Sequence, residues 1–368
     1  DDRLAGPDEL DRMRDLVRAG MESGGWGLSS GPFYAPGSYS DTHELVELAR
    51  VVAPFGGAYQ SHVRDESDYS IGVVAAVEEV IHVAREAGIA GVWTHAKALG
   101  PPVWGFSTAL MSRLERARAE GVEVYTDQYP YLASATSLTS ALLPRWAQAG
   151  GTDSLRVRLR RPADRARIRE AAVENLARRG GADRIQFRRF PEAPGIEGRT
   201  LAAVAAQRGV DPVDAALELF AQGAPAIVSF NMHEDDVRGL MRRPYTMTAS
   251  DGRLVPMGSG VPHPRSYAAF TRKLTTYVRE GVVDLESAVR SMTSLPASVY
   301  RIPDRGTIRV GAVADLVVFH PNELGTESTF TDPHHLARGM RWVVVNGQLA
   351  IDDGAFTGVR AGRVLRKN

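Results

Sequence analysis

The sequence predicts an α/β protein built on a (β/α)8 TIM-type barrel, with a helical insertion and a small C-terminal β-sandwich portion. Short apolar runs alternate with amphipathic helical segments over residues 41–129, a pattern typical of parallel sheets. Polar residues also recur where each strand-like run ends, at separations of 28, 33 and 34 residues: Tyr34, His62, His95 and Tyr129. One βαβ unit occupies roughly 30 residues, so these side chains are expected together at one rim of the barrel.

The first four helices have recognisable ends. Pro7 with acidic residues after it begins the first helix, which ends at Gly24-Gly25, and Gly88 and Gly121 follow two later helices. A turn-rich segment, 27–37, is expected after the first helix. The expected helices lie within 1–30 and at 41–52, 71–87 and 108–119, and the expected strands are 57–62, 89–95, 122–129 and 245–252.

An insertion and a change of structural class follow along the chain. Tyr129 and Asp251 are 122 residues apart, more than one unit needs, and residues 140–200 are Arg-rich and helical in pattern. From about Asp304 the sequence turns to short β segments, including 306–311 and a hairpin with an Asn-Gly turn. We therefore expect a barrel domain at 1–139 and 201–303, a helical insertion able to act as a lid at 140–200, and a β-sandwich portion at 304–368.

The sequence contains fewer expected barrel strands than a closed barrel requires. Only about five can be assigned, whereas a closed barrel of this type needs eight. We therefore expect the barrel to be incomplete in this chain, which would correspond to the later part of a longer protein.

Composition excludes several classes of protein. The 44 Lys and Arg residues balance 44 Asp and Glu, so a general nucleic-acid or anionic-membrane binder is not expected. There is no Cys, which excludes disulfides and thiolate metal sites within this sequence. No apolar run approaches the ~18 residues of a membrane span, and a cytoplasmic location is the default expectation.

Three residues of the predicted rim are candidate metal ligands. His62 and His95 end adjacent strands, and Asp251 adds a carboxylate from a later one. Two imidazoles and a carboxylate suit Zn²⁺ with an open coordination position. The alternative is a buried hydrogen-bonded network without metal.

Arg265 is a candidate for binding substrate. It follows two prolines in the loop after Asp251, and a guanidinium on a stiff loop can bind a substrate carboxylate through two hydrogen bonds. The alternative is a surface Arg paired with a nearby acid. By spacing, Tyr34, Tyr129 and Lys97 share the same rim.

Eight segments of this sequence, taken in order, resemble the N-acyl-D-amino-acid deacylase (D-aminoacylase) family of the amidohydrolase superfamily. They are GLSSGPFYAPG (27–37), GGAYQSHVRDE (56–66), GVWTHAKALG (91–100), DQYPYLAS (127–134), TASDG (248–252), HPR (263–265), MTSLPAS (292–298) and GTIRVGAVADLVVF (306–319).

The resemblance implies zinc-dependent hydrolysis of N-acyl-D-amino acids with one or two Zn²⁺ ions. It makes His62 and His95 metal ligands, and Asp251 the catalytic aspartate and a further ligand. It assigns the α-carboxylate and amide of the substrate to a second group: Arg265, Tyr34, Lys97, Tyr129 and Ser134.

One part of the family pattern is absent. The His-x-His pair of the first strand and the bridging Cys do not occur in this sequence. We therefore expect an N-terminal polypeptide or segment carrying His-x-His to complete the site. The expected partners are that segment and a small N-acyl amino acid, with neither nucleic acid nor membrane. Two other functions stay open, a cyclic-amide hydrolase related to dihydroorotases and hydantoinases, and a non-catalytic barrel subunit.

Overall fold

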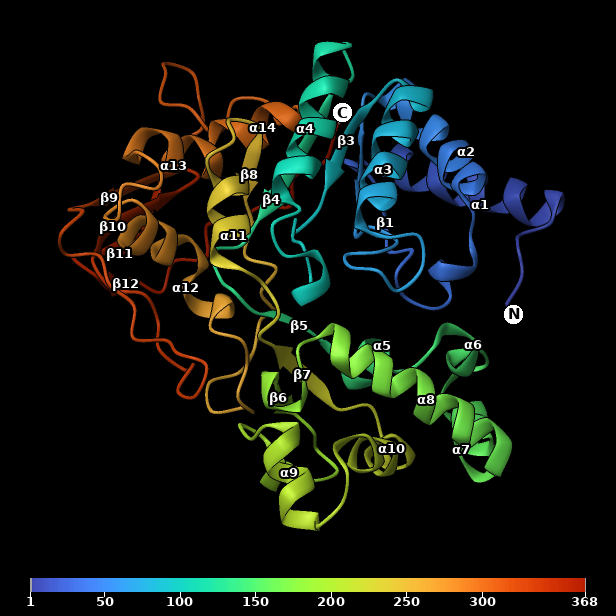
Figure 1. Ribbon diagram of the computed structural model, residues 1–368. Helices are drawn as coiled ribbons and strands as arrows, with labels where there is room; N and C mark the ends of the chain where they lie inside the picture. The colour runs from blue at the N-terminus through green and yellow to red at the C-terminus, as the bar shows by residue number, and fades with distance from the viewer. Residues whose placement is uncertain (1, 368) are drawn as a thin grey trace.

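A parallel sheet of five strands organises the computed structural model, which describes residues 2–367. Its order is β1-β2-β3-β4-β8, and every neighbouring pair is parallel (Figure 1). The strands are β1 (Gly27–Ser30), β2 (Ala58–Ser61), β3 (Ala90–Trp93), β4 (Val124–Gln128) and β8 (Thr246–Thr248). The predicted α/β class is confirmed, and closure into an eight-stranded barrel stays a prediction.

Four helices alternate with the first strands, as the sequence predicts. They are α1 (Pro7–Glu22), α2 (Thr42–Val52), α3 (Val73–Ala87) and α4 (Ser107–Ala119). The side chain of Asp41 caps α2 by accepting a hydrogen bond from the N–H of Glu44, and Gly88 ends α3 in the left-handed conformation. Their apolar faces pack on the sheet around the fully buried Trp93 and Leu114, and this packing fixes where the strands end.

The segment 27–37 differs from the expectation of turns alone. Its first four residues form β1, where Gly27 lies opposite Ala58 of β2. A Cβ on Gly27 would lie 2.0 Å from the carbonyl oxygen of Ala58, so glycine is required there. The four residues Gly-Leu-Ser-Ser give no strand pattern by themselves, and pairing with β2 decides their conformation.

A second sheet lies between β4 and β8 in the sequence and faces the strand ends of the first. It is antiparallel, in the order β5-β7-β6, and below the parallel sheet in Figure 1. Its strands are β5 (Ser134–Ser137), β6 (Ile185–Arg189) and β7 (Ala226–Ser229), and its helices are α5 (Leu138–Leu142), α6 (Arg145–Gln148), α7 (Gly151–Arg160), α8 (Pro162–Arg178), α9 (Leu201–Arg208) and α10 (Pro212–Gln222). The strands come from inside and from both sides of the predicted insertion 140–200, whose boundaries stay a prediction.

The C-terminal part forms an antiparallel sheet in the order β12-β11-β10-β9. The remaining elements are α11 (Glu234–Met241), α12 (Arg265–Arg272), α13 (Leu285–Met292), α14 (Ser294–Val299), β9 (Leu316–Phe319), β10 (Met340–Val345), β11 (Gln348–Asp352) and β12 (Ala355–Phe356). The Asn-Gly turn joins β10 to β11 with positive φ at both residues, as expected. The prediction of a β segment at 306–311 was wrong, because that stretch pairs with no described strand and leaves Ile308 and Val310 almost fully exposed.

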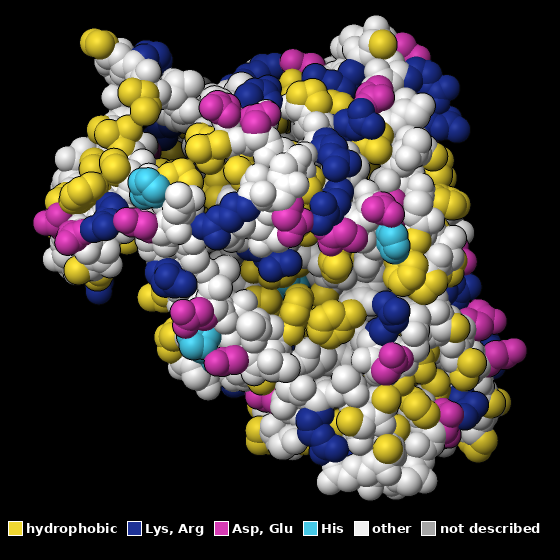
Figure 2. Space-filling model, turned by 60° about the vertical axis from the view of Figure 1, so that its left-hand side comes forward, with side chains coloured by type: hydrophobic (Ala, Val, Ile, Leu, Met, Phe, Trp, Pro, Cys, Tyr) yellow, Lys and Arg dark blue, Asp and Glu magenta, His cyan; other side chains and the backbone are white. Residues whose placement is uncertain are grey.

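The surface agrees with the balanced composition. Basic and acidic side chains are interspersed on the face shown in Figure 2. Between residues 2 and 367, no helix combines the length and the apolar character needed to cross a membrane.

The buried side chain of Lys273 should make the stability of the fold depend on pH. Lys273 donates hydrogen bonds to the hydroxyls of Thr248 (2.7 Å) and Ser291 (2.9 Å) and has no acidic partner among the described residues. Burial lowers the pKa of Lys273 from 10.5 to about 8. Between these values the unfolded chain binds more protons than the folded one, so stability contributed by this residue rises as pH increases from 8 to 10.5.

We expect wild type to gain roughly 3 kcal/mol relative to Lys273→Met over that range, since one pKa unit corresponds to about 1.4 kcal/mol. Urea unfolding of both proteins at pH 7, 8, 9 and 10.5 measures the difference. Parallel stability curves would contradict the buried-charge explanation.

Candidate active site

One cavity of about 620 Å³ lies where the parallel strands end and face the antiparallel sheet β5-β7-β6, which is called the inserted sheet below. Its lining contains every site residue predicted from the sequence: Tyr34, His62, His95, Lys97, Tyr129, Ser134, Asp251 and Arg265. The structure therefore brings these eight residues together, and their individual roles stay predictions.

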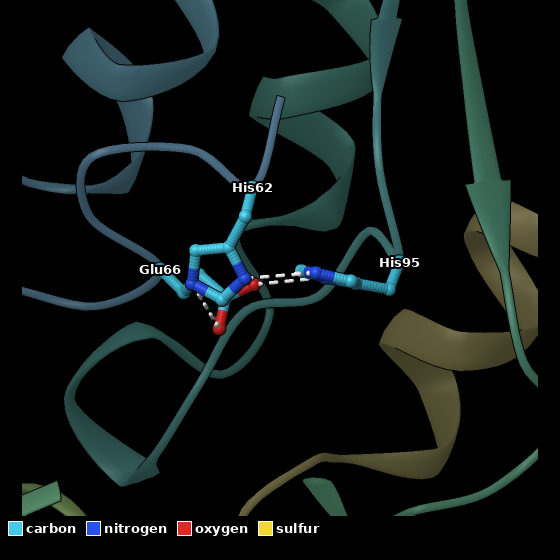
Figure 3. A group of neighbouring side chains, drawn as sticks. All are labelled: His62, Glu66 and His95. Carbon is cyan, nitrogen blue, oxygen red and sulfur yellow. Dashed lines mark hydrogen bonds and ion pairs between the residues drawn. The ribbon is translucent and has the colours of Figure 1, made fainter. Parts of the chain in front are cut away.

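The two histidines and one glutamate form the group best suited to hold a metal among residues 2–367. His62 follows β2, His95 follows β3, and Glu66 lies in the loop after β2 (Figure 3). Their candidate ligand atoms all lie within 4.8 Å of one another. His62 Nδ1 is 2.8 Å from His95 Nε2, and His95 Nδ1 is 3.2 Å from a Glu66 oxygen. The three side chains thus converge from two neighbouring strand ends.

Glu66 is a residue that the sequence analysis missed. It stands four residues after His62 in Ser61-His62-Val63-Arg64-Asp65-Glu66, and that spacing was the available signal. Burial acts to raise the pKa of Glu66, but Lys97 and the two histidines outweigh it and hold the pKa well below its usual range. Lys97 Nζ lies 2.6 Å from Glu66 and 2.7 Å from His95 Nδ1. Lys97 therefore lines the cavity and also contacts two of the three candidate metal ligands, Glu66 and His95.

A buried aspartate holds His95 in place. Asp127, at the end of β4, accepts a hydrogen bond of 2.6 Å from the backbone N–H of His95. His95 has φ +40°, a conformation that costs a non-glycine residue energy and is often found at functional sites. Burial raises the pKa of Asp127. The sequence analysis did not identify this positioning role.

The donor set fits a divalent metal ion such as zinc. Two imidazoles and a carboxylate are ligands that Zn²⁺ prefers, with a further coordination position open. Burial holds the pKa of His62 well below its usual range, which favours the neutral imidazole that a metal requires. His62 Nε2 is buried and makes no hydrogen bond among the described residues, and a Glu66 oxygen lies 4.0 Å from it.

Asp251 lies in the same cavity but outside this three-residue group. Its carboxylate pairs with the Arg265 guanidinium at 2.7 Å, and its side chain is 38% exposed. Its φ is +45°, again an unusual conformation after a strand end. Asp251 therefore shares the cavity with the candidate metal ligands and contacts the arginine, and its assignment as a metal ligand stays a prediction.

The lining of the same cavity also contains Arg265 and several polar residues. Arg265 begins α12, is 6% exposed and stacks over the Tyr129 ring at 4.4 Å. Its Nη1 is buried and makes no hydrogen bond with any residue between 2 and 367. Tyr34 contacts the His62 ring at 4.7 Å between centroids and hydrogen-bonds Thr136, while Ser134 hydrogen-bonds the side-chain amide of Asn231.

The inserted sheet and its helices also contribute basic residues that the sequence analysis missed. Arg179, at the end of α8, and Arg188, in β6, both line the cavity. Among the described residues, five basic side chains face two carboxylates there: Lys97, Arg179, Arg188, Arg253 and Arg265 against Glu66 and Asp251. Arg179 and Arg188 could be found only from the fold, because the insertion lies far from the strand-end motifs in the sequence.

Removal of one histidine should abolish tight zinc binding. We expect His95→Ala to weaken zinc affinity by more than about 100-fold, because one of two imidazole ligands is lost. Competition with a chromophoric zinc chelator measures the change. His43→Ala, which alters an exposed histidine of α2, is the matched control and should bind zinc as wild type does. Equal affinity of the two variants would contradict the assignment.

A parallel α/β sheet whose strand ends converge on two histidines and a carboxylate is typical of metal-dependent hydrolases. Residues 2–351 match the model of a family described as the amidohydrolase family. The chain belongs to the amidohydrolase family.

Two curated proteins and one crystal structure are similar to this chain over nearly its whole length. The chain is 36% identical to an N-acyl-D-glutamate deacylase and 35% identical to a D-aminoacylase, both from Alcaligenes xylosoxydans xylosoxydans, over 97% and 99% of its length. It covers 64% and 66% of these two proteins, and so less than two thirds of their length. A crystal structure of N-acyl-D-glutamate deacylase from Bordetella bronchiseptica, complexed with zinc and a phosphonate inhibitor, is 34% identical with a TM-score of 0.81, over 100% of this chain and 68% of that one.

Proposed function

We propose that this protein is a zinc-dependent amidohydrolase that cleaves the amide bond of N-acyl-D-amino acids, releasing a carboxylic acid and a D-amino acid. One observation carries the proposal: a single cavity holds the His62, Glu66 and His95 group beside Asp251 and Arg265. Three relatives that are 33–36% identical over nearly the whole chain support it: an N-acyl-D-glutamate deacylase, a D-aminoacylase and an N-acyl-D-aspartate deacylase.

His62, Glu66 and His95 would hold the metal, with Asp251 as a further candidate ligand. Zinc, as one or two ions, supplies Lewis acidity when bound, lowering the pKa of water and polarising a carbonyl. Lys97 supports the group by donating to Glu66.

Asp251 and Arg265 perform the remaining chemistry. Arg265 binds the substrate α-carboxylate, which fixes the scissile amide and distinguishes D from L substrates. Arg265 is paired with Asp251 before substrate binds. When the substrate carboxylate also pairs with Arg265, Asp251 is released for proton transfer. Asp251 accepts a proton from the attacking water and delivers it to the departing amine nitrogen.

The remaining predicted residues line the path of the substrate. The Tyr129 ring supports the Arg265 guanidinium from below. Tyr34, in the segment after β1, and Ser134, at the start of β5, both line the cavity, and their hydroxyls would hydrogen-bond the acyl amide. Both already bond other protein groups, so their orientation is fixed before substrate arrives.

We also propose that the sheet closes into a barrel and that a further segment carrying His-x-His completes the metal site. Two features support this: β1 and β8 are edge strands of the described parallel sheet, and exposed edges are usually paired or covered. A denaturing intact-mass spectrum of the purified material tests it. A second polypeptide or a longer chain with His-x-His is expected, whereas a single 39.9 kDa species that is fully active would contradict it.

The function is tested by measuring amino-acid release from N-acetyl-D-methionine, N-acetyl-L-methionine and, as ring opening, dihydroorotate and hydantoin. We expect zinc-dependent release from the D-amide alone. Opening of the cyclic amides without release of D-methionine would instead indicate a cyclic-amide hydrolase. No hydrolysis and no bound zinc would indicate a non-catalytic subunit.

A further inference from the structure

His263 is a buried histidine of the cavity lining, and both of its ring nitrogens make hydrogen bonds. The residue is 2% exposed, and its Nδ1 accepts a hydrogen bond of 3.1 Å from the backbone N–H of Arg265. Because Nδ1 accepts, the ring proton is on Nε2, which donates to the carbonyl oxygen of Ala133 at 2.9 Å. The ring is therefore held in one tautomer and one orientation, and neither nitrogen is free to bind a metal ion.

The surroundings of His263 keep its imidazole uncharged. The rings of Tyr131 and Phe330 contact it edge-on, at 5.0 and 4.9 Å between centroids. Burial and the nearby Arg265 guanidinium hold the pKa of His263 well below its usual range. A charged imidazolium carries a proton on both nitrogens and accepts no hydrogen bond, so only the neutral form can make the contact with Arg265.

The hydrogen bond from Arg265 satisfies a backbone donor at the start of α12. Pro264 is the N-cap of this helix and supplies no side-chain hydrogen bond, and the first N–H groups of a helix have no partner within it. His263 provides the acceptor for Arg265, the first residue of α12. This contact fixes the point from which the Arg265 side chain extends over the Tyr129 ring to Asp251.

The hydrogen bond to Ala133 ties the same imidazole to the inserted sheet. Ala133 directly precedes Ser134, the first residue of β5, and both Ser134 and Arg265 line the cavity. One imidazole thus bridges two backbone segments that are far apart in the sequence and that each carry a predicted substrate contact.

We propose that His263 is a positioning residue, which places Arg265 through its Nδ1 so that the guanidinium can bind the α-carboxylate of the substrate. This inference rests on the proposed function. A guanidinium binds a carboxylate through two hydrogen bonds only in a narrow range of orientations. The backbone around Arg265 is also tightly packed, since a Cβ on Gly252 would lie 2.8 Å from the Cα of Ser266. A shift of Arg265 would therefore also disturb its ion pair with Asp251.

Two substitutions of His263 separate its two hydrogen bonds. In His263→Asn, the side-chain oxygen can take the place of Nδ1 and accept from Arg265, but the side chain is too short to reach Ala133. In His263→Gln, the side-chain nitrogen can take the place of Nε2 and donate to Ala133, but the N–H of Arg265 loses its acceptor. Each variant loses the aromatic ring and one hydrogen bond, so we expect similar decreases in the thermal unfolding midpoint. A difference in ligand binding between the two variants then reports on Arg265 and not on lost packing.

His334 provides a matched control outside the cavity. Its Nδ1 is 2.9 Å from the hydroxyl of Tyr267, and its Nε2 donates to the carbonyl oxygen of Gly260 at 3.0 Å. His334 is absent from the cavity lining, whereas Tyr267 belongs to α12. His334→Gln therefore disturbs a contact of the same helix without removing the acceptor for Arg265.

The test compares two ligands that resist hydrolysis, N-methanesulfonyl-D-methionine and N-methanesulfonyl-3-(methylthio)propylamine, by isothermal titration calorimetry with the purified protein. The second ligand lacks only the α-carboxylate. We expect wild type, His263→Asn and His334→Gln to bind the ligand with the carboxylate at least about 30-fold more tightly than the other. His263→Gln should reduce this ratio by at least about tenfold, since small misplacements of a binding group have large effects, and should bind the ligand without the carboxylate as wild type does.

Four results would overturn the proposal. They are no carboxylate preference in wild type, an unchanged preference in His263→Gln, an equal loss of preference in His263→Asn and His263→Gln, and an equal loss in His334→Gln. The last two would assign His263 to general packing of α12.

The measurement needs no turnover, so it is independent of the hydrolysis assay. The expected differences in binding, without release of D-methionine from N-acetyl-D-methionine, would retain the role of His263 and reject the deacylase function. Hydrolysis together with an unchanged preference in His263→Gln would do the reverse.

Discussion

Asp251→Asn should lower kcat for N-acetyl-D-amino acids by about 1,000-fold, since general acid–base groups contribute up to roughly 10,000-fold. Asparagine has nearly the same shape and can still accept a hydrogen bond from Arg265, but it cannot take a proton from water. Among the described residues, Asp251 makes no hydrogen bond or ion pair with the candidate metal ligands His62, Glu66 and His95. Zinc content should therefore stay at the wild-type level, as measured by mass spectrometry of the metal.

The control for this variant is Asp235→Asn, which removes an exposed carboxylate in the first turn of α11 and should leave kcat unchanged. Wild-type turnover by Asp251→Asn would contradict the proton-transfer role. Loss of zinc together with activity would instead assign Asp251 to the metal, which is the other role that the family resemblance implies.

Arg265→Ala should lower kcat/KM for N-acetyl-D-methionine by about 1,000-fold. The loss has two causes: a charge-assisted bidentate contact disappears, and the amide is no longer held in a reactive orientation. Arg265→Lys keeps the charge but not the fork of donors, so it should recover only part of the loss. Steady-state kinetics on the three proteins measure the effect.

Because Arg265 is buried, circular dichroism and thermal unfolding should accompany these kinetics, and Arg189→Ala is the matched surface control. Hydantoin has no free carboxylate to bind, so Arg265→Ala would leave the opening of its ring almost unchanged in a cyclic-amide hydrolase. A kcat/KM within about threefold of wild type for the linear substrate would contradict the assigned role.

The parallel sheet and most of the site could be predicted from local patterns. Strand–helix alternation is visible in the sequence, and parallel strands place their C-terminal ends at one edge. Residues that follow successive strands, such as His62 and His95, must therefore converge. The spacing argument succeeds because it depends on the repeat and on no long-range contact.

The residues that were missed depend on contacts between distant segments. Glu66 lies in an irregular loop, where it contacts Lys97 and His95. A loop has no periodic sequence pattern, so the sequence does not indicate these contacts. Arg188 reaches the cavity because β6 pairs with β7, a pairing that joins separate parts of the sequence. β1 and the stretch 306–311 were misjudged for the same reason, since a short strand exists only where a partner strand is present.

The most direct test is anomalous diffraction from crystals grown with zinc, with data collected on both sides of the zinc absorption edge. We expect an anomalous peak among His62, Glu66 and His95, inside the cavity that also contains Asp251 and Arg265. No peak in that cavity, or zinc bound only elsewhere, for example at His334 and His335, would contradict the assignment of this cavity as a zinc-dependent active site.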